Sequence, residues 1–218
     1  MMRHDDDIFE DQFPTTVMER HHREVDELNA DLFQLIHDME QRYSGTEENA
    51  VRSGLIATQG GYQTSTRTNV FQINHPAIER FRQKLVMPAV RSYLERVFGD
   101  EARQLNPWPR GWATVLHEGD WQKPHMHPVE KNVASAVYYV KLPGDMQPPQ
   151  GCIEFMNPHP LSANHGFPMT RLLHPAEGKL IMFPPYHIHF VHPFRGSGDR
   201  VIISFDVLAQ PPGPQFVF

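Results

Sequence analysis

The chain of 218 residues contains a single cysteine, Cys152, so an internal disulfide framework cannot hold it together. It also has no apolar stretch of the ~18 residues that a membrane span needs. Lys and Arg form no run, and 20 basic against 26 acidic residues give a formal net charge of −6. These absences argue against a membrane protein and against nucleic acid or an anionic membrane surface as a partner.

The first segment, MMRHDDDIFEDQF, is too acidic and polar for a signal peptide, which predicts a cytoplasmic protein. The length lies within the range of one domain. We expect residues 1–13 to form a poorly ordered acidic arm and residues 211–218 an extended tail. Between them, residues 14–106 are predicted to form a helical support region of the same domain as a β core over residues 107–210.

Two helices are predicted in the first half. Thr16 and Glu19 match a capping box, and apolar residues recur at helical spacing from Val25 to Met39 until Gly45 ends the pattern. Residues 64–73, TSTRTNVFQI, favour a loop or an edge strand because they are rich in β-formers but poor in apolar alternation.

The second helical stripe runs from Pro76 to Gly99, and Pro88 should kink or split it. Beyond Pro107 the apolar period changes from 3.6 to 2. Two helices followed by at least six short strands predict a mainly β, jelly-roll-like or cupin-like pair of sheets with the helices packed on one outer face. The runs expected as strands are WATVLH, ASAVYYVKL, CIEFM, KLIMF, HIHFV and RVIISFDV.

Fourteen histidines are concentrated in the second half of the chain. His125 and His127 alternate along an extended segment, so both rings can face one ion. A chain this rich in histidine also produces such triplets by chance, and hydrogen-bonded surface histidines explain one pair equally well. We place residues 125–128 in a loop and His189 on a strand leading into a hairpin closed by residues 195–198. A jelly roll can bring these regions together.

Three imidazoles on one face of an octahedral ion leave three positions open, as non-haem iron(II) sites require. Arg200 opens the strand RVIISFDV, and a charged residue at the head of a buried strand needs a partner. It could hold the far carboxylate of a bidentate acid through a forked pair. It could also pair with Asp199 or Asp206 on the surface.

The ordered blocks GDWQKPHMHP, ASAVYYVKLPG, GCIEF, GKLIMFPPYHIHFVHP and DRVIISFD cover roughly residues 108–208. They resemble the 2-oxoglutarate and iron(II)-dependent oxygenases, in particular a bacterial and phage-type group similar to prolyl hydroxylases. The resemblance implies a double-stranded β-helix with Fe(II), 2-oxoglutarate and O2 as cofactors. It also implies hydroxylation of a second substrate with release of succinate and CO2.

Carried over by position, the resemblance implies metal ligands at His125, His127 and His189. It implies that Arg200 binds the distal carboxylate of 2-oxoglutarate, with Tyr139 and Ser204 in the same pocket. No catalytic residue is expected beyond the metal ligands. Tyr138 should face away from Tyr139, which could alternatively be core filling.

His127 stands where the family usually has a carboxylate, and this departure leaves the full +2 charge on the metal. Glu130 could supply a carboxylate instead, although it would need a reversal of the loop. A three-histidine site also suits zinc. The rival interpretation is therefore a cupin-like metal protein without 2-oxoglutarate chemistry, either a zinc-binding module or an iron-only dioxygenase. A non-catalytic sheet module that recognises peptide or sugar is a third reading.

Two further histidines are expected either to support the ligands from behind or to lie on the surface, His187 and His192. The others are expected to be solvated: His117, His159, His165 and His174. Trp112 and Trp121 could wall the pocket or fill the core, and Cys152 is expected to be a small buried residue. The primary substrate is open to a small molecule or a peptide. The sequence leaves the oligomeric state open, with a homodimer as one option.

Overall fold

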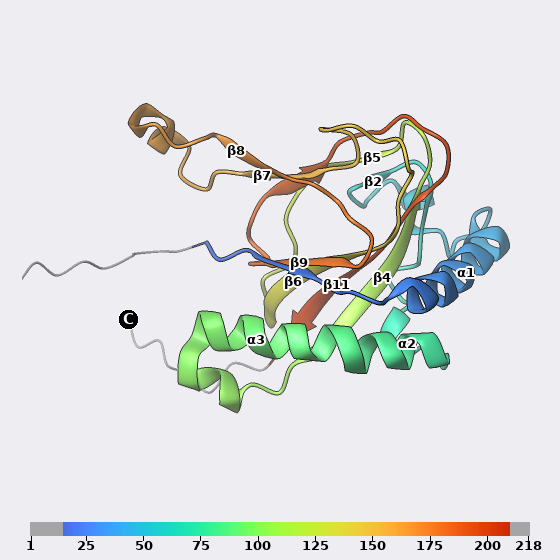
Figure 1. The fold of residues 1–218 in the computed structure, drawn as a ribbon, viewed down its shortest axis with the longest axis horizontal. Coiled ribbons are helices and arrows are strands. Elements are labelled where there is room, and N and C mark those ends of the chain that lie inside the picture. The colour runs from blue at the N-terminus through green and yellow to red at the C-terminus, as the bar shows by residue number, and fades with distance from the viewer. Residues whose placement is uncertain (1–14, 210–218) are drawn as a thin grey trace, which may run out of the picture.

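The computed structural model describes residues 15–209, so the predicted arm and tail lie outside the described residues. Two antiparallel sheets pack against each other, as Figure 1 shows. The larger has the strand order β1-β9-β6-β11-β4-β3 and the smaller β2-β5-β10-β7-β8, which confirms the predicted jelly-roll class. The strands are β1 (Met18–His21), β2 (Thr58–Gln59), β3 (Tyr62–Gln63), β4 (Trp108–Leu116), β5 (Trp121–His125), β6 (Asn132–Lys141), β7 (Ile153–Met156), β8 (Thr170–Leu173), β9 (Lys179–Phe183), β10 (His189–Val191) and β11 (Arg200–Leu208).

Alternation along β11 assigns its side chains to two separate cores. Val201 and Ile203 pack into the core beneath the helices, whereas Ile202 packs into the core between the sheets. Because side chains alternate along a strand, Arg200 and Ser204 share the inward face of Ile202. The inward face of β11 therefore carries polar groups into the space between the sheets.

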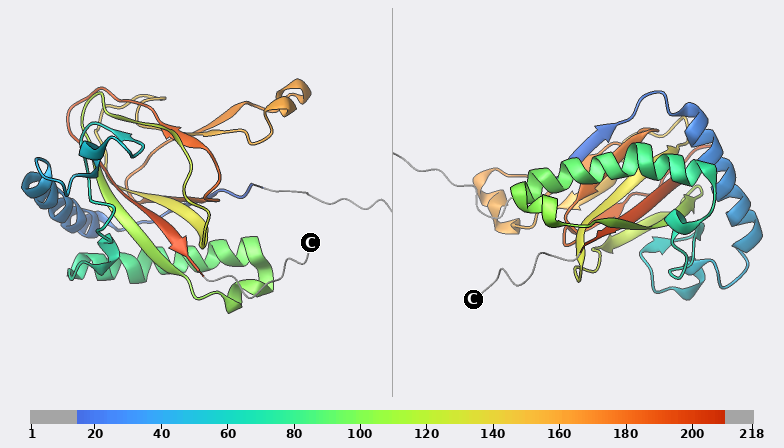
Figure 2. Two further views of the ribbon diagram at one scale, coloured as in Figure 1. Left: turned by 180° about the vertical axis from the view of Figure 1, so that it is seen from behind. Right: turned by 90° about the horizontal axis from the view of Figure 1, so that it is seen from below.

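The three α-helices cover the outer face of the six-stranded sheet, as the two views of Figure 2 show. The hydroxyl of Tyr138 on β6 donates to Oδ1 of Asn29 at 2.7 Å, which ties α1 to that sheet. The prediction that helices cover one outer face is confirmed. The helices are α1 (Asp26–Tyr43), α2 (Pro76–Phe81) and α3 (Met87–Phe98), with short 3₁₀ segments at Ala50–Ser53, Val70–Gln72, Gly99–Gln104 and Pro160–His165. None of the described helices is long and apolar enough to cross a membrane.

Pro88 splits the second helical stripe as predicted. A π-helical turn, Arg82–Val86, separates α2 from α3 directly before Pro88. Proline has no N–H to give to the carbonyl four residues earlier, so the preceding turn widens and α3 restarts with Pro88 in its first turn.

The predicted capping box at Thr16 and Glu19 is wrong. Met18–His21 instead forms β1, which pairs with the edge of β9, and α1 begins only at Asp26. The carboxylate of Glu19 bonds the ammonium of Lys179 at 2.5 Å, and that lysine is buried. The residues thus form a strand and not a helix start, because β1 covers the edge of β9 and Glu19 neutralises the buried charge of Lys179.

The six predicted runs form β4, β6, β7, β9, β10 and β11. The five strands missed by the periodicity are short, and several are polar, such as Thr58–Gln59. Two local predictions are wrong. His125 ends strand β5 and does not lie in a loop, and β10 and β11 belong to different sheets, so residues 195–198 do not close a hairpin.

Candidate metal centre and cofactor cavity

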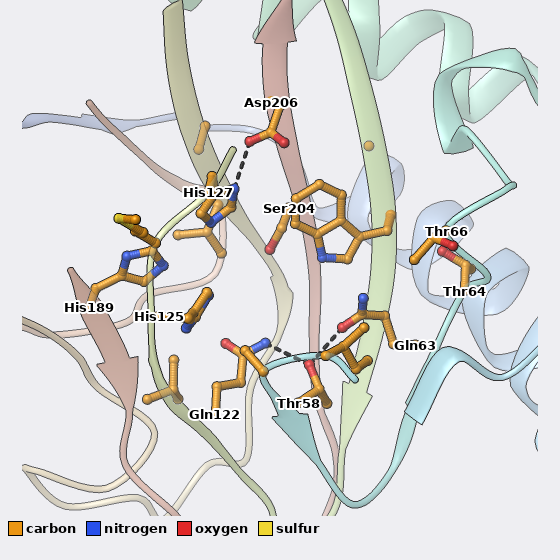
Figure 3. Close-up of a pocket in the computed structure, with 18 of the residues that line it drawn as sticks. Thr58, Gln63, Thr64, Thr66, Gln122, His125, His127, His189, Ser204 and Asp206 are labelled. Atoms are coloured by element: carbon orange, nitrogen blue, oxygen red, sulfur yellow. Dashed lines mark hydrogen bonds and ion pairs between the residues drawn. The ribbon is translucent and has the colours of Figure 1, made fainter. Parts of the chain in front are cut away.

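Three histidines converge between the two sheets (Figure 3). His125 ends β5 and pairs in register with His189 at the start of β10. His127 follows β5 by two residues, and its backbone N–H bonds the carbonyl of Pro185. One ring nitrogen from each histidine lies within 4.8 Å of the other two. The strand pairing thus joins imidazoles that are more than sixty residues apart in the sequence.

A β-bulge in β5 lets it place two side chains in the same space. Against β10, His189 pairs with His125 but Val191 pairs with Gln122, so β5 holds one residue more than its partner. An extra residue reverses the alternation. Gln122 and His125 therefore both line the cavity, although a regular strand would send them to opposite faces.

Hydrogen bonds fix the tautomer of all three imidazoles. Nδ1 of His125 bonds the carbonyl of Lys123 at 2.8 Å, and Nδ1 of His189 bonds the carbonyl of His187 at 2.9 Å. Nδ1 of His127 bonds the carboxylate of Asp206 at 2.6 Å. Because these oxygens accept, each Nδ1 carries the proton and each Nε2 keeps a lone pair. Three such nitrogens are a donor set that iron(II) or zinc accepts.

Asp206 is a site residue that the sequence reasoning did not identify. Its Oδ1 accepts both the His127 ring proton and the hydroxyl of Ser135 at 2.7 Å, and Asn132 donates in turn to Ser135. The carboxylate thus reaches the proposed metal position only through the ring of His127. One signal could have found it, because Asp206 lies on the same inward face of β11 as Arg200 and Ser204.

Burial keeps His125 and His189 neutral. It lowers the pKa of His125 to about 4, with a smaller contribution from the neighbouring His127. Burial also holds the pKa of His189, which is 4% exposed, well below its ordinary value, and His125 and His127 lower it further. Neutral imidazoles are the form that binds a metal, so these two side chains are ready as ligands near neutral pH.

Arg200 is 0% exposed and has no carboxylate partner among the described residues. Its Nε donates to the carbonyl of Gly151 at 3.1 Å, and its guanidinium lies 5.2 Å from the centre of the Tyr139 ring. Nη1 of Arg200 and the hydroxyl of Tyr139 are both buried, and neither has a hydrogen-bond partner among the described residues. A buried donor pair without an acceptor fits an incoming carboxylate, since leaving such groups unpaired is costly. Ser204 lines the same cavity.

The alternative partners of Arg200 are engaged elsewhere. Asp206 bonds His127, and Asp199 bonds Nδ1 of His117 at 2.9 Å. Glu130 is exposed and lies outside the histidine cluster, so the structure brings His127 and not Glu130 to the site.

The other singled-out residues separate into two groups. His187 supports the site, since its carbonyl holds His189 and its own ring bonds the carbonyl of Met156. His192 pairs with Glu154 away from the cluster. Trp112 packs on His127 and lines the cavity, whereas Trp121 is exposed and does not. His159, His165 and His174 are exposed, as predicted, and Cys152 is buried.

A cavity of about 470 Å³ joins the histidine cluster to Arg200. One wall comes from β2, β3 and the loop that follows, which the sequence reasoning did not assign to the site. The clue available was the run TSTRTN, whose hydroxyl side chains are dense for a surface loop. The volume is within the range of small-molecule sites.

Comparison with known proteins places this arrangement in a class. The fold is that of the 2-oxoglutarate and iron(II)-dependent oxygenases, an enzyme class whose cofactors are iron(II) and 2-oxoglutarate, with O2 as the usual co-substrate. Residues 110–206 match the family described as "Putative 2OG-Fe(II) oxygenase", which confirms the resemblance noted from the sequence blocks. No curated protein matches the sequence at a significant level.

Several solved structures share the fold. A prolyl-4-hydroxylase from Pseudomonas putida has 13% identity and a TM-score of 0.57, with 88% of this chain and 91% of that one covered. HygX from Streptomyces hygroscopicus, solved with nickel and 2-oxoglutarate bound, has 10% identity and a TM-score of 0.56 over 89% and 82% of the two chains. The α-ketoglutarate-dependent epimerase SnoN of nogalamycin biosynthesis has 12% identity and a TM-score of 0.58 over 93% and 83%. At these identities the likeness establishes the fold.

Proposed function

We propose that the chain is a hydroxylase in which His125, His127 and His189 hold iron(II) through their Nε2 atoms. The observation that carries the proposal is the convergence of three imidazoles whose Nδ1 protons are all fixed, in one cavity with an unpaired buried arginine. Iron(II) bound there would couple the decarboxylation of 2-oxoglutarate by O2, to succinate and CO2, with hydroxylation of a C–H bond in a second substrate, one oxygen atom of O2 going to each product.

Arg200 and Tyr139 would bind the distal carboxylate of 2-oxoglutarate. Nη1 of Arg200 and the Tyr139 hydroxyl supply two donors where water has no access, and a charge-assisted bond is stronger in such a setting. Burial raises the pKa of Tyr139 to about 12, so its hydroxyl keeps its proton and donates. Ser204, on the same strand face, adds a hydroxyl to this part of the cavity.

Asp206 would act as the carboxylate that the ligand set itself lacks. It accepts a hydrogen bond from Nδ1 of His127, which polarises that imidazole and makes Nε2 a stronger donor to a cation. Ser135 and Asn132 hold the carboxylate in place. The three-histidine site thereby gains an anionic group without a direct carboxylate ligand.

The test is anaerobic addition of iron(II) and 2-oxoglutarate to the metal-free protein. Chelation of iron(II) by the 2-oxo acid should give a visible metal-to-ligand charge-transfer band, and the zinc-loaded protein is the matched control without one. No band with iron(II), together with zinc that co-purifies, would contradict the proposal and support a three-histidine metal-binding protein without 2-oxoglutarate chemistry.

A further inference from the structure

The cavity wall across from the histidines consists of uncharged hydrogen-bonding side chains, as Figure 3 shows. It is built by β2, β3 and the loop after β3, together with Gln122 from the start of β5, while the histidines come from the end of β5, the segment after it and β10. We call this surface the amide-hydroxyl wall. Its members are Thr58, Gln63, Thr64, Ser65, Thr66 and Gln122.

Three buried side chains of the amide-hydroxyl wall form a directed chain of hydrogen bonds. Nε2 of Gln122 donates to Oγ1 of Thr58 at 2.9 Å, and that hydroxyl donates to Oε1 of Gln63 at 2.6 Å. A hydroxyl has only one proton, so Thr58 accepts from one amide and donates to the other, and the two amides have opposite roles. Thr58 thus couples the orientations of its two neighbours.

The opposite roles of the two amides leave one acceptor and one donor for a ligand. Oε1 of Gln122 and Nε2 of Gln63 have no side-chain or backbone partner among the described residues, although each glutamine is only 7% exposed. In Figure 3 the Gln122 oxygen is directed toward His125 and the Gln63 nitrogen toward the side of Ser204. Both glutamines line the cavity, so these two atoms are available to a ligand that displaces water from them.

The charges around the cavity select against an ionic partner. Asp206 is the only carboxylate among the lining residues, and it is already engaged by His127 and Ser135, so nothing is left to neutralise a cation. An anion would meet the acceptor oxygen of Gln122 beside the histidines. Two further cations line the cavity: Arg110, which is exposed and bonds the carbonyl of Thr66, and Lys123, which is half-buried.

We propose that the primary substrate is an uncharged small molecule bearing hydroxyl or carboxamide groups, which donates to Oε1 of Gln122 and accepts from Nε2 of Gln63. The inference rests on the proposed function, because it concerns the second substrate of the same site. The volume of about 470 Å³, part of which 2-oxoglutarate would occupy, suits a metabolite. A site whose amides hydrogen-bond to the substrate strongly rejects molecules that lack the matching hydroxyl or carboxamide groups.

The experiment measures binding without turnover. Ligand-observed NMR on the full chain, with and without nickel(II) and 2-oxoglutarate, compares probes of similar size and different charge: nicotinamide with nicotinate, and N-acetylglucosamine with glucosamine. In each pair for which binding is detected, we expect the neutral probe to bind at least about tenfold more tightly than the charged probe. Gln63→Leu and Gln122→Leu should each weaken that binding roughly tenfold, as the loss of one buried hydrogen bond does.

Gln59→Leu is the matched control, since Gln59 lies next to Thr58 on β2, bonds only backbone carbonyls and does not line the cavity. Gln63→Glu keeps the shape of the side chain and removes the donor, so it should weaken the neutral probes even if the leucine variant folds poorly. Equal or tighter binding of the charged members, unchanged binding in folded Gln63 and Gln122 variants, or no binding of any neutral probe would each overturn the inference. The iron(II) and 2-oxoglutarate band of the unmodified chain reports separately on the proposed function.

Discussion

At the scale of single residues, the electrostatics of the metal centre depend on Asp206. A carboxylate bonded to the outer nitrogen of a metal-binding histidine orients the ring and raises its basicity. Nδ1 of His125 and of His189 bonds a neutral backbone carbonyl, so His127 is the only one of the three with an anionic partner. In the proposed site, the negative charge that iron sites in this class usually take from a ligand would come from Asp206 through the His127 ring.

Asp206→Asn should weaken iron(II) binding by about 10-fold to 100-fold, because the amide oxygen can still accept the His127 proton but the charge is lost. Competition with a coloured chelator under anaerobic conditions measures the affinity. Asp199→Asn is the control, since Asp199 also bonds a histidine, His117, but outside the metal centre. Equal losses in the two variants, or no loss in Asp206→Asn, would remove Asp206 from the site.

Arg200 should reduce the stability of the protein without its co-substrate. It is fully buried, burial lowers its pKa, and no carboxylate of the described residues compensates its charge. Arg200→Met should therefore leave the free energy of unfolding unchanged or raise it by roughly 1–3 kcal/mol, while abolishing stabilisation by 2-oxoglutarate. Urea unfolding with and without 2-oxoglutarate tests both parts, and Arg195→Met, an exposed arginine, is the control. A variant that 2-oxoglutarate still protects would contradict the role of Arg200.

At the scale of elements, His117 links three segments. It follows β4, its Nε2 lies 2.9 Å from the carboxylate of Glu40 on α1, and its Nδ1 lies 2.9 Å from Asp199, just before β11. Burial acts to lower the pKa of His117, but the hydrogen bond that its ring donates to Asp199 and the charge of Glu40 outweigh it and raise the pKa above its ordinary value. The predicted solvated histidine is thus half-exposed but paired on both sides.

A raised pKa in the folded state means that the contribution of His117 to stability is complete below its unfolded pKa of about 6.5 and is lost as the pH rises through the folded value. The difference in unfolding free energy between the native chain and His117→Gln should therefore be larger at about pH 6 than at about pH 9. It should not exceed about 1 kcal/mol because the ring is half-exposed. Urea titrations at the two pH values measure it. A difference that grows toward high pH would contradict the linkage.

Elements with strong periodicity could be predicted from the sequence because their burial is one-sided. Tyr138 and Tyr139 were expected to face opposite ways, and the structure places Tyr138 beneath the helices and Tyr139 between the sheets. β1 could not be predicted, since its pairing with the edge of β9 and the buried charge of Lys179 are properties of the tertiary structure. The bulge that turns Gln122 inward is equally invisible in the sequence, because it is a mismatch between two strands.

At the scale of the whole molecule, the sequence indicated which residues carry the chemistry but not how they meet. The distance between His127 and His189 along the chain is bridged by the pairing of β5 with β10. The sequence predicted that a jelly roll brings the two regions together, but not this pairing, because residues 125–128 were expected to form a loop. Asp206 and Gln63 were missed because their roles depend on neighbours from other strands. The two sheets carry different parts of one site, with the histidine pair on the smaller sheet and Arg200 on the larger.

The most direct test of this account is a crystal structure of the protein prepared anaerobically with iron(II) and 2-oxoglutarate, with data collected at the iron absorption edge. The account predicts one anomalous peak bonded to Nε2 of His125, His127 and His189, with the distal carboxylate of 2-oxoglutarate at Arg200 and Tyr139. An iron peak held by other side chains, or a 2-oxoglutarate carboxylate away from Arg200, would contradict it.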